Sequence, residues 1–280
     1  MVEDLLNLGP HVDAHFIEKR DRADWETKVL HRLVDGLDRH TLFEQVRRFV
    51  HVGRKSACGE EAGTIADYDV VLGNYVGPRW PTETEQDFVK FIESGHGYVA
   101  VHSADNAFPD WPEYNRICGV GGWYGRKEHS GPHVYLDDAD LEVRDTSVGS
   151  GGHHGPQHEY PIRIRDSTHP ITRGLPATWL HTKDELYDSL RGPATEMHIL
   201  ATAYSDPKFD GTSKHEPMLM TITYQGGRVF HTVLGHADYS MKCAGFVTTL
   251  LRGTEWAATG DVTIPIPENF PTAEKTSPVE

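Results

Sequence analysis

The sequence has few cysteines, no long apolar run and no excess of basic residues. Disulfide-rich proteins, membrane proteins and nucleic-acid-binding proteins depend on these features. Its 280 residues include three cysteines, Cys58, Cys118 and Cys243, an odd number at wide spacing. That pattern argues against a disulfide framework and fits a reducing compartment, so we expect a cytoplasmic protein. No apolar run approaches the roughly 20 residues of a membrane helix. The N-terminus "MVEDLLNLGP" has neither the basic region nor the apolar core of a signal peptide.

The charge balance narrows the range of partners. Acidic residues outnumber basic ones, 42 against 27, for a formal net charge of −15. Such a surface would repel a phosphate backbone or an anionic membrane, so we expect no nucleic-acid and no membrane partner. We also expect no nucleotide cofactor, because no strand–GxGxxG–helix frame and no GKS or GKT phosphate loop occurs. A neutral or cationic small molecule is favoured, and sugars are neutral; assembly into a homo-oligomer stays open.

A strand, a helix and a second strand follow one another in the middle of the chain. The β-branched run "YDVVLGNY", residues 68–75, predicts a buried strand. "PTETEQDFVKFIESG" predicts a helix, because acids fill its first turn and Phe88, Phe91 and Ile92 recur at helical spacing. "GYVAVHSA", residues 97–104, predicts the second strand. This βαβ unit favours an α/β fold.

The flanking segments predict further elements of one domain. "HVYLDDADLEVRD", "YPIRIRD" and "MHILATAYSD" are typical of antiparallel strands, and "PMLMTITYQGGRVFHTVLGH" of a hairpin over "QGG". "ADWETKVLHRLVDGL" and "AGFVTTLLRGTEWAA" predict helices, and "VDAHFIE" is a candidate first strand. Without an internal repeat or a linker, we expect a single domain over residues 1–262. The Pro-rich tail, residues 263–280, is expected to be extended or partly disordered.

Polar side chains follow both strands of the βαβ unit. In an open parallel sheet, ligands gather outside the carboxyl ends of the strands. Asn74 and Tyr75 follow the first strand, and His102, Asp105 and Asn106 follow the second. A structural histidine has little packing reason to follow a hydrophobic strand, so we predict a functional role for His102. A serine–histidine nucleophile is not indicated, because no GxSxG elbow is present.

Histidines are the most unusual feature of the composition. Twelve of the 18 lie between residues 102 and 236. The stretch "GGHHGPQHEYPI" holds His153, His154, His158 and Glu159, and Gly155-Pro156 forbids a continuous helix through them. Three further segments pair histidines with carboxylates, and these are His181 with Asp184 and Glu185, His215 with Glu216, and His236 with Asp238.

Three interpretations of the histidine-rich segments stay open. A divalent metal, Zn or Mn, would take three or four such ligands, with His153, His154 and His236 as candidates. The known signatures HExxH and CxxC are absent, so a metal-free polar pocket or a surface loop would explain the same residues. Trp123 and other aromatic residues lie between these polar segments. They would either stack on a sugar or anchor long loops to the core.

The ordered motifs resemble the ThuA-like family, which is named for trehalose utilisation. The resemblance is carried by "DYDVVLGNYVGPRWP", "GHGYVAVHSADNAFPDWPEYN", "GVGGWYGR", "GGHHGPQHEYPI", "HPITRGLP", "HTKDELYDSLRGP", "HEPMLMTITYQGGRVFHTVLGHA" and "GTEWAATG". It covers roughly residues 66–262. It implies a flavodoxin-like fold similar to class I glutamine amidotransferases, with a mostly parallel central sheet, helices on both faces and long loops at the strand ends. It also implies a link to trehalose or related glycosides, often beside oxidoreductases that make 3-keto sugars.

Two departures limit what the resemblance implies. Similar proteins open with a strand that ends in a glycine-rich, histidine-containing turn before Asp-Trp. This chain keeps Asp24-Trp25 without that turn, so residues 1–65 match poorly. Amidotransferases carry a nucleophilic cysteine on a strand-end elbow, whereas His102 lies near the equivalent strand end here. Glutamine hydrolysis is therefore not carried over.

The leading hypothesis is an enzyme acting on a glycoside or 3-keto-glycoside by hydrolysis, elimination or isomerisation. His102 and a carboxylate, from Asp184 or Glu185, would act as acid and base, with or without a metal that polarises an oxygen. The side chains expected to bind substrate are Asn74, Tyr75, Asp105, Asn106, Trp123, His158, Glu159, His215 and Glu216. One alternative is a non-catalytic sugar-binding or regulatory protein. Another is a metal-dependent hydrolase of a non-sugar amide or ester.

Overall fold

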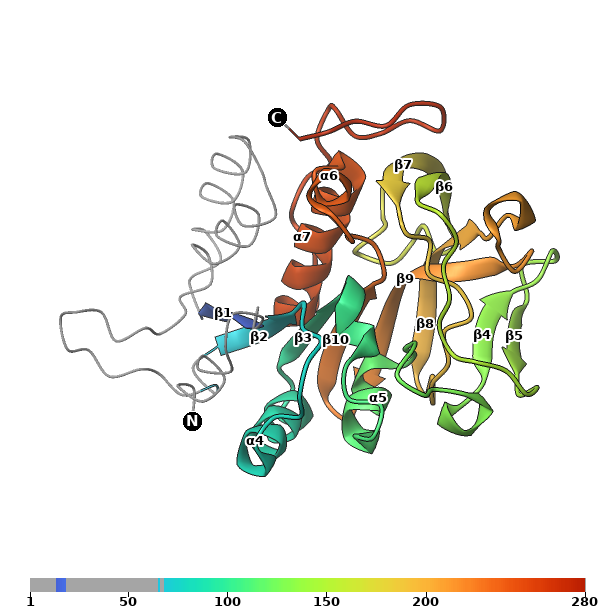
Figure 1. Cartoon of the computed structure of the whole chain (residues 1–280). Helices are drawn as coiled ribbons and strands as arrows, with labels where there is room; N and C mark the ends of the chain where they lie inside the picture. Colours follow the sequence, from blue (N-terminus) through green and yellow to red (C-terminus); the bar gives the residue numbers. More distant parts are fainter. Residues whose placement is uncertain (1–13, 19–64, 66–67, 280) are drawn as a thin grey trace.

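The structure is a computed structural model that describes residues 14–18, 65 and 68–279. The described strands form one ten-stranded sheet (Figure 1). They are β1 (Ala14–Glu18), β2 (Tyr68–Gly73), β3 (Gly97–Val101), β4 (His133–Leu136), β5 (Glu142–Asp145), β6 (His158–Ile164), β7 (Thr178–Asp184), β8 (Met197–Tyr204), β9 (His215–Tyr224) and β10 (Gly227–Thr232). The α-helices are α4 (Thr82–Glu93), α5 (Pro112–Cys118), α6 (Asp238–Met241) and α7 (Ala244–Thr259). Short 3-10 helices are η3 (His102–Asn106), η4 (Glu128–Ser130) and η5 (Pro207–Phe209).

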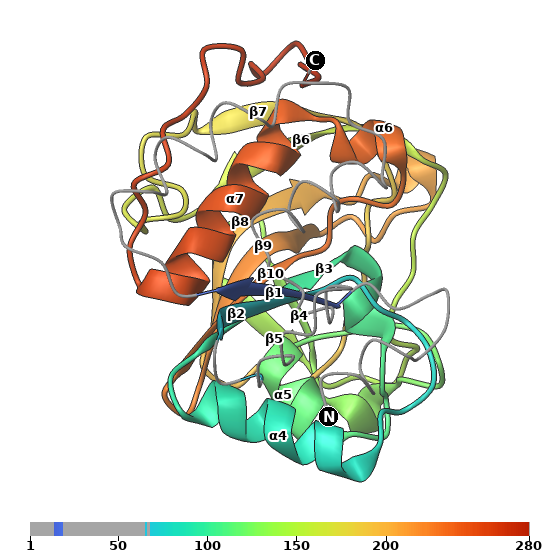
Figure 2. The same cartoon turned by 90° about the vertical axis from the view of Figure 1, so that its left-hand side faces the viewer.

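The predicted flavodoxin-like, mostly parallel sheet is wrong. The strand order is β1-β2-β3-β10-β9-β8-β6-β7, with β4 and β5 attached beside β9. Among the described strands, β2 with β3 and β3 with β10 pair in parallel, and the other pairings are antiparallel. Antiparallel strands need no helical crossover between them. The sheet is therefore mixed, has few helices and curls into a half-barrel (Figures 1 and 2).

The parallel part of the sheet has helices on both faces. Figure 2 shows α7 on one face of β2, β3 and β10, and α4 and α5 on the other. The β2–α4–β3 unit follows the order that the sequence predicts. Phe88, Phe91 and Ile92 of α4 are buried, and Glu83 and Glu85 lie in its first turn, where the helix dipole favours negative charge. Hydrophobic periodicity and end signals together explain this unit.

Two further local elements follow the sequence pattern. The hairpin over "QGG" is confirmed, because β9 and β10 pair antiparallel on either side of Gln225 and Gly226. The candidate first strand is β1, which pairs antiparallel with β2. The predicted helix "ADWETKVLHRLVDGL" lies outside the described residues. Residues 263–279 follow α7 without a regular helix or strand and return to it through a bridge between Cys243 and Pro278.

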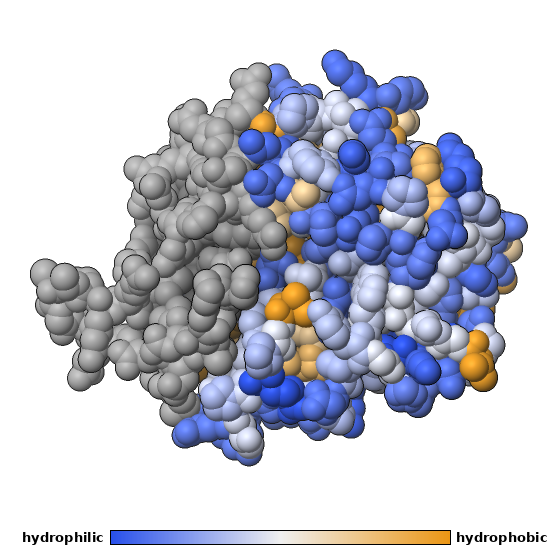
Figure 3. Space-filling view, viewed as in Figure 1, coloured by the Kyte–Doolittle hydropathy of each residue, from blue (hydrophilic) through white to orange (hydrophobic). Residues whose placement is uncertain are grey.

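The described surface in one view is mostly hydrophilic. Hydrophobic residues appear on that face in small separate groups (Figure 3). No helix in the described part of the chain is long and apolar enough to cross a membrane.

Replacing Gly253 with alanine should destabilise the fold by about 1–3 kcal/mol, the usual cost of overpacking a core. A Cβ atom at Gly253 would overlap the buried Phe230 ring, so α7 would have to move away from β10. Gly149→Ala is the matched control, because the nearest atom to its Cβ would be an Arg191 guanidinium nitrogen at 3.1 Å and not a buried ring. Urea denaturation of both variants measures the difference. Equal stability of Gly253→Ala and the wild type would contradict the tight packing of α7.

Candidate active site

Three strand ends meet at one place in the curled sheet. In the parallel register of β3 and β10, Val101 lies opposite Thr232, so His102 and the segment after β10 emerge at the same edge. The end of β7 lies several strands away in the sheet order. The curl nevertheless brings it close, because the Asp184 carboxylate accepts hydrogen bonds from the backbone N–H groups of Gly235 and His236. A flat sheet would hold these two ends apart.

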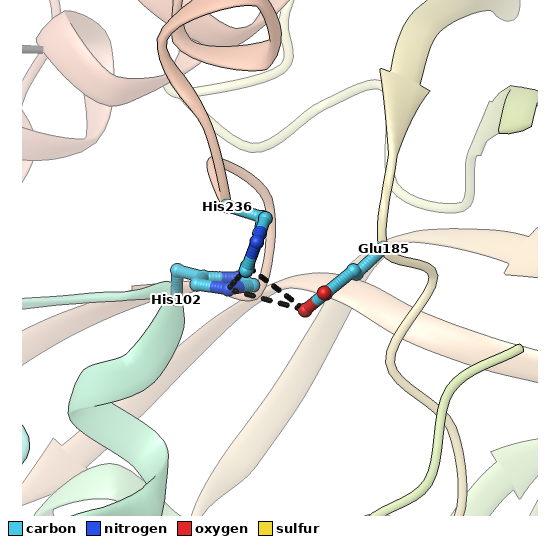
Figure 4. Close-up of side chains that lie close together, drawn as sticks. All are labelled: His102, Glu185 and His236. Atoms are coloured by element: carbon cyan, nitrogen blue, oxygen red, sulfur yellow. Dashed lines mark hydrogen bonds and ion pairs between the residues drawn. The ribbon is translucent and has the colours of Figure 1, made fainter. Parts of the chain in front are cut away.

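His102, Glu185 and His236 point toward one another at this meeting place (Figure 4). His236 Nδ1 lies 3.0 Å from Glu185 Oε2 and 3.2 Å from His102 Nε2. His102 Nε2 lies 3.7 Å from the same Glu185 oxygen. The His102 and Glu185 side chains are almost buried, whereas the His236 side chain is 41% exposed. Among the described residues, these three form the group placed to hold a metal ion.

His102 is held in one tautomer and in a strained conformation. Its Nδ1 lies 2.8 Å from the Val233 carbonyl oxygen, which can only accept, so Nδ1 carries the proton. Nε2 is then unprotonated, and its lone pair accepts a hydrogen bond from the Tyr187 hydroxyl at 2.9 Å. Burial lowers the pKa of His102 and outweighs the nearby Asp184 charge, which favours the neutral imidazole. The backbone φ of +45° lies in the left-handed region, and strain of this kind is concentrated at functional sites.

Asp184 fixes the two segments that carry Glu185 and His236. Its fully buried carboxylate accepts from His181 Nε2 at 2.9 Å, and from the N–H groups of Gly235 at 2.8 Å and His236 at 3.1 Å. The Gly235 backbone has a φ of +107°, which glycine adopts without a steric penalty. Burial would raise the pKa of Asp184, but its hydrogen bond and ion pair with His181 hold the pKa below the ordinary value. Asp184 therefore stays ionised behind the site.

The outer side of Glu185 faces the histidine-rich loop. His154 Nε2 lies 3.6 Å from Glu185 Oε1, and the Gln157 amide lies 3.5 Å from the same oxygen. His154 Nδ1 donates to the Gly155 carbonyl oxygen, so the ring turns its Nε2 toward Glu185. The Trp123 ring, which is partly buried, lies 4.5 Å from the Tyr187 ring between centroids. Polar groups and aromatic faces thus border one edge of the centre.

The other histidine-rich residues lie apart from this centre. His153 Nδ1 pairs with the buried Asp188 at 3.1 Å, so it does not join His154 and His236. His158 stacks on Phe209, and Glu159 is exposed beside it.

The predicted site residues of β9 also lie elsewhere. Glu216 is buried against His133 at 2.9 Å and accepts from the Thr212 hydroxyl at 2.7 Å. His215 is partly buried beside Tyr204. The grouping of His153, His154 and His236 as metal ligands stays a prediction that this arrangement does not favour.

The predicted residues at the ends of β2 and β3 are mostly buried. Asn74 accepts from the Ser103 hydroxyl at 3.0 Å, and the Tyr75 hydroxyl donates to the Pro78 carbonyl oxygen at 2.8 Å. Asp105 faces His231 at 3.4 Å beneath the site, with both groups fully enclosed. These side chains lie buried next to the site, and their roles in substrate binding stay predictions.

Sequence reasoning missed two polar residues that border the centre, Gln157 and Tyr239. Gln157 contacts Glu185 and accepts from the Tyr239 hydroxyl. Tyr239 lies three residues beyond His236, which is the available sequence signal. Tyr187 is one of the aromatic residues between the polar segments, but its hydrogen bond to His102 depends on a contact across 85 positions of the chain.

Comparisons with known proteins agree with the motifs. The model of the ThuA family, described as trehalose utilisation, matches residues 45–257. A ThuA-like protein from Parabacteroides merdae is 48% identical, with a TM-score of 0.75, over 77% of this chain and 79% of that one.

More distant structures are similar over comparable lengths. A ThuA-like protein from Bacteroides uniformis is 16% identical, with a TM-score of 0.48, over 71% of this chain and 72% of that one. A cytoplasmic protein from Salmonella typhimurium is 12% identical, with a TM-score of 0.41, over 69% and 73% of the two chains. Neither of these two supports an argument about function. No curated protein matches the sequence.

Proposed function

The chain belongs to the ThuA family of trehalose utilisation, and we propose on that premise that it is an enzyme acting on a glycoside or 3-keto-glycoside. One observation supports the proposal above the others. His102, Glu185 and His236 converge within hydrogen-bonding or ion-pairing distance, and the Nε2 lone pair of His102 faces the other two side chains. Converging titratable groups of this kind are typical of proton-transfer sites.

The chemistry of a keto sugar suits such a centre. A ketone acidifies the neighbouring C–H bond, so a nearby base can remove that proton and a nearby acid can protonate the leaving or the carbonyl oxygen. Hydrolysis, elimination and isomerisation all need this pair of groups. We assign proton transfer to His102 and Glu185, with His236 as the partly exposed third member. Asp184 exposes no surface, so its part is to position Glu185 and His236.

A non-catalytic sugar-binding protein is the second candidate. The observation that favours it is the aromatic edge formed by Trp123 and Tyr187, since sugar rings stack on such faces. In that case the polar centre would only hydrogen-bond sugar hydroxyls. The sugar would then be bound and released without chemical change.

Incubation with 3-keto-glycosides, their parent glycosides and simple esters tests the proposal. We expect the keto-glycosides to be converted, with product detected by mass spectrometry and NMR. Binding of sugars without product would support the second candidate. Turnover of esters alone would overturn both and indicate a hydrolase of non-sugar substrates.

A further inference from the structure

We infer that His102 Nε2, His236 Nδ1 and Glu185 Oε2 bind a divalent transition-metal cation. The inference deepens the proposed function and rests on it for the identity of the site. The donor set of two imidazoles and one carboxylate suits the metals from manganese to zinc. It differs from the set that the sequence suggests, because it replaces His153 and His154 with His102 and Glu185.

The spacing of the three donor atoms fits one cation. Their pairwise separations are 3.0, 3.2 and 3.7 Å. With bonds of about 2.1 Å, neighbouring ligands lie about 3.0 Å apart around an octahedral ion and about 3.4 Å apart around a tetrahedral ion. The observed separations bracket both values. One cation can therefore lie within bonding distance of all three donors once the ring proton of His236 moves from Nδ1 to Nε2.

The orientation of His102 and the surroundings of Glu185 suit a bound cation. His102 donates its Nδ1 proton to the Val233 carbonyl oxygen, the usual way in which a metal-binding histidine is oriented. Hydrogen bonds and ion pairs of the three side chains, within the described residues, include no lysine or arginine. The Glu185 charge thus has no fixed cationic partner. A divalent cation would supply one.

The buried support behind the three ligands is already rigid. Asp184 accepts from the backbone N–H groups of both Glu185 and His236, so one carboxylate positions two of the ligands. The Tyr187 hydroxyl lies 2.9 Å from His102 Nε2 and would turn away when the lone pair binds the cation.

Cation binding changes how protons move at the centre. One lone pair cannot hold a cation and a proton at the same time. In the loaded protein, the three ligands would occupy one side of the cation and leave positions for water and a carbonyl oxygen of substrate. The proton transfer assigned above to His102 and Glu185 applies to the metal-free centre, and in the loaded protein it would pass to the neighbouring Tyr187 and His154.

Calorimetric titration of chelator-treated, untagged protein with ZnCl2 and with MnCl2 tests the inference. We expect about one equivalent of at least one metal to bind. The variants Glu185→Gln and His236→Ala should weaken binding by more than about 100-fold, since loss of an outer-shell partner alone costs about 10–100-fold. His153→Ala and the distant, exposed His198→Ala should bind like the wild type. Circular dichroism of each variant checks that it folds.

The outcomes separate this inference from the proposed function. Absence of binding, or binding lost in His153→Ala and kept in Glu185→Gln and His236→Ala, would overturn the metal centre. Keto-glycoside turnover by such a metal-free protein, unaffected by chelator, would leave the proposed function standing. Metal binding that is lost in the predicted variants, without turnover of any glycoside or keto-glycoside, would support the metal centre and overturn the proposed substrate.

Discussion

Replacing His102 with asparagine should reduce keto-glycoside turnover by about 100-fold or more, with a much smaller change in substrate affinity. His102 Nε2 faces both Glu185 and His236, and an amide cannot take its place in binding a proton or a cation. Asparagine is the suitable replacement because it tolerates a left-handed backbone better than most residues. The φ at this position is +45°. Steady-state kinetics and calorimetric binding of a sugar measure the two effects separately.

His198→Ala provides the control for this experiment. His198 is exposed and pairs with Asp166 at 2.9 Å, away from the three converging side chains. Its kinetics should match those of the wild type. If His102→Asn keeps the wild-type kcat and changes only affinity, His102 binds substrate and takes no part in the chemical step. Wild-type kinetics and affinity in both variants would remove His102 from the site.

The elements that sequence predicted well are those set by short-range patterns. The β2–α4–β3 unit depends on a helical period between two apolar runs, and the β9–β10 hairpin depends on one turn. The long-range order of the strands was wrong because it was taken from a resemblance. Segments such as "YPIRIRD" indicated antiparallel pairing locally, and β6 does pair antiparallel with β7 and β8. The local pattern was the better guide.

The members of the candidate site were each visible in the sequence, but their grouping was not. His102, Glu185 and His236 lie on segments separated by up to 134 positions, and only the curl of the sheet brings their strand ends together. Periodicity carries no information about such a closure.

The sequence also could not show which of the adjacent carboxylates, Asp184 or Glu185, faces the two histidines. Asp184 is the last residue of β7 and turns into the protein toward His181, whereas Glu185 follows the strand and faces the two histidines. This difference in direction decides which carboxylate has access to the centre.

Replacing Asp184 with alanine should lower the free energy of unfolding by about 3–5 kcal/mol, the range for breaking one side of a buried ion pair. His181 and Asp184 are both fully buried, so the substitution leaves an enclosed imidazole without its partner. The N–H groups of Gly235 and His236 also lose their acceptor. Asp184→Asn keeps an acceptor oxygen and should lose less. Urea denaturation measures both values, and a loss below about 1 kcal/mol for alanine would contradict this role.

The pH dependence identifies the ion pair as the source of that stability. Burial alone would lower the pKa of His181, but its hydrogen bonds, first to Asp184, raise the pKa to about 9. The unfolded value is about 6.5, so this contribution is full below pH 6.5 and is lost as the pH rises toward 9. The stability difference between wild type and Asp184→Asn should therefore shrink from pH 6.5 to pH 9. A difference that stays constant over this range would assign the effect to the backbone hydrogen bonds alone, which hold the His236 segment whatever the charge on His181.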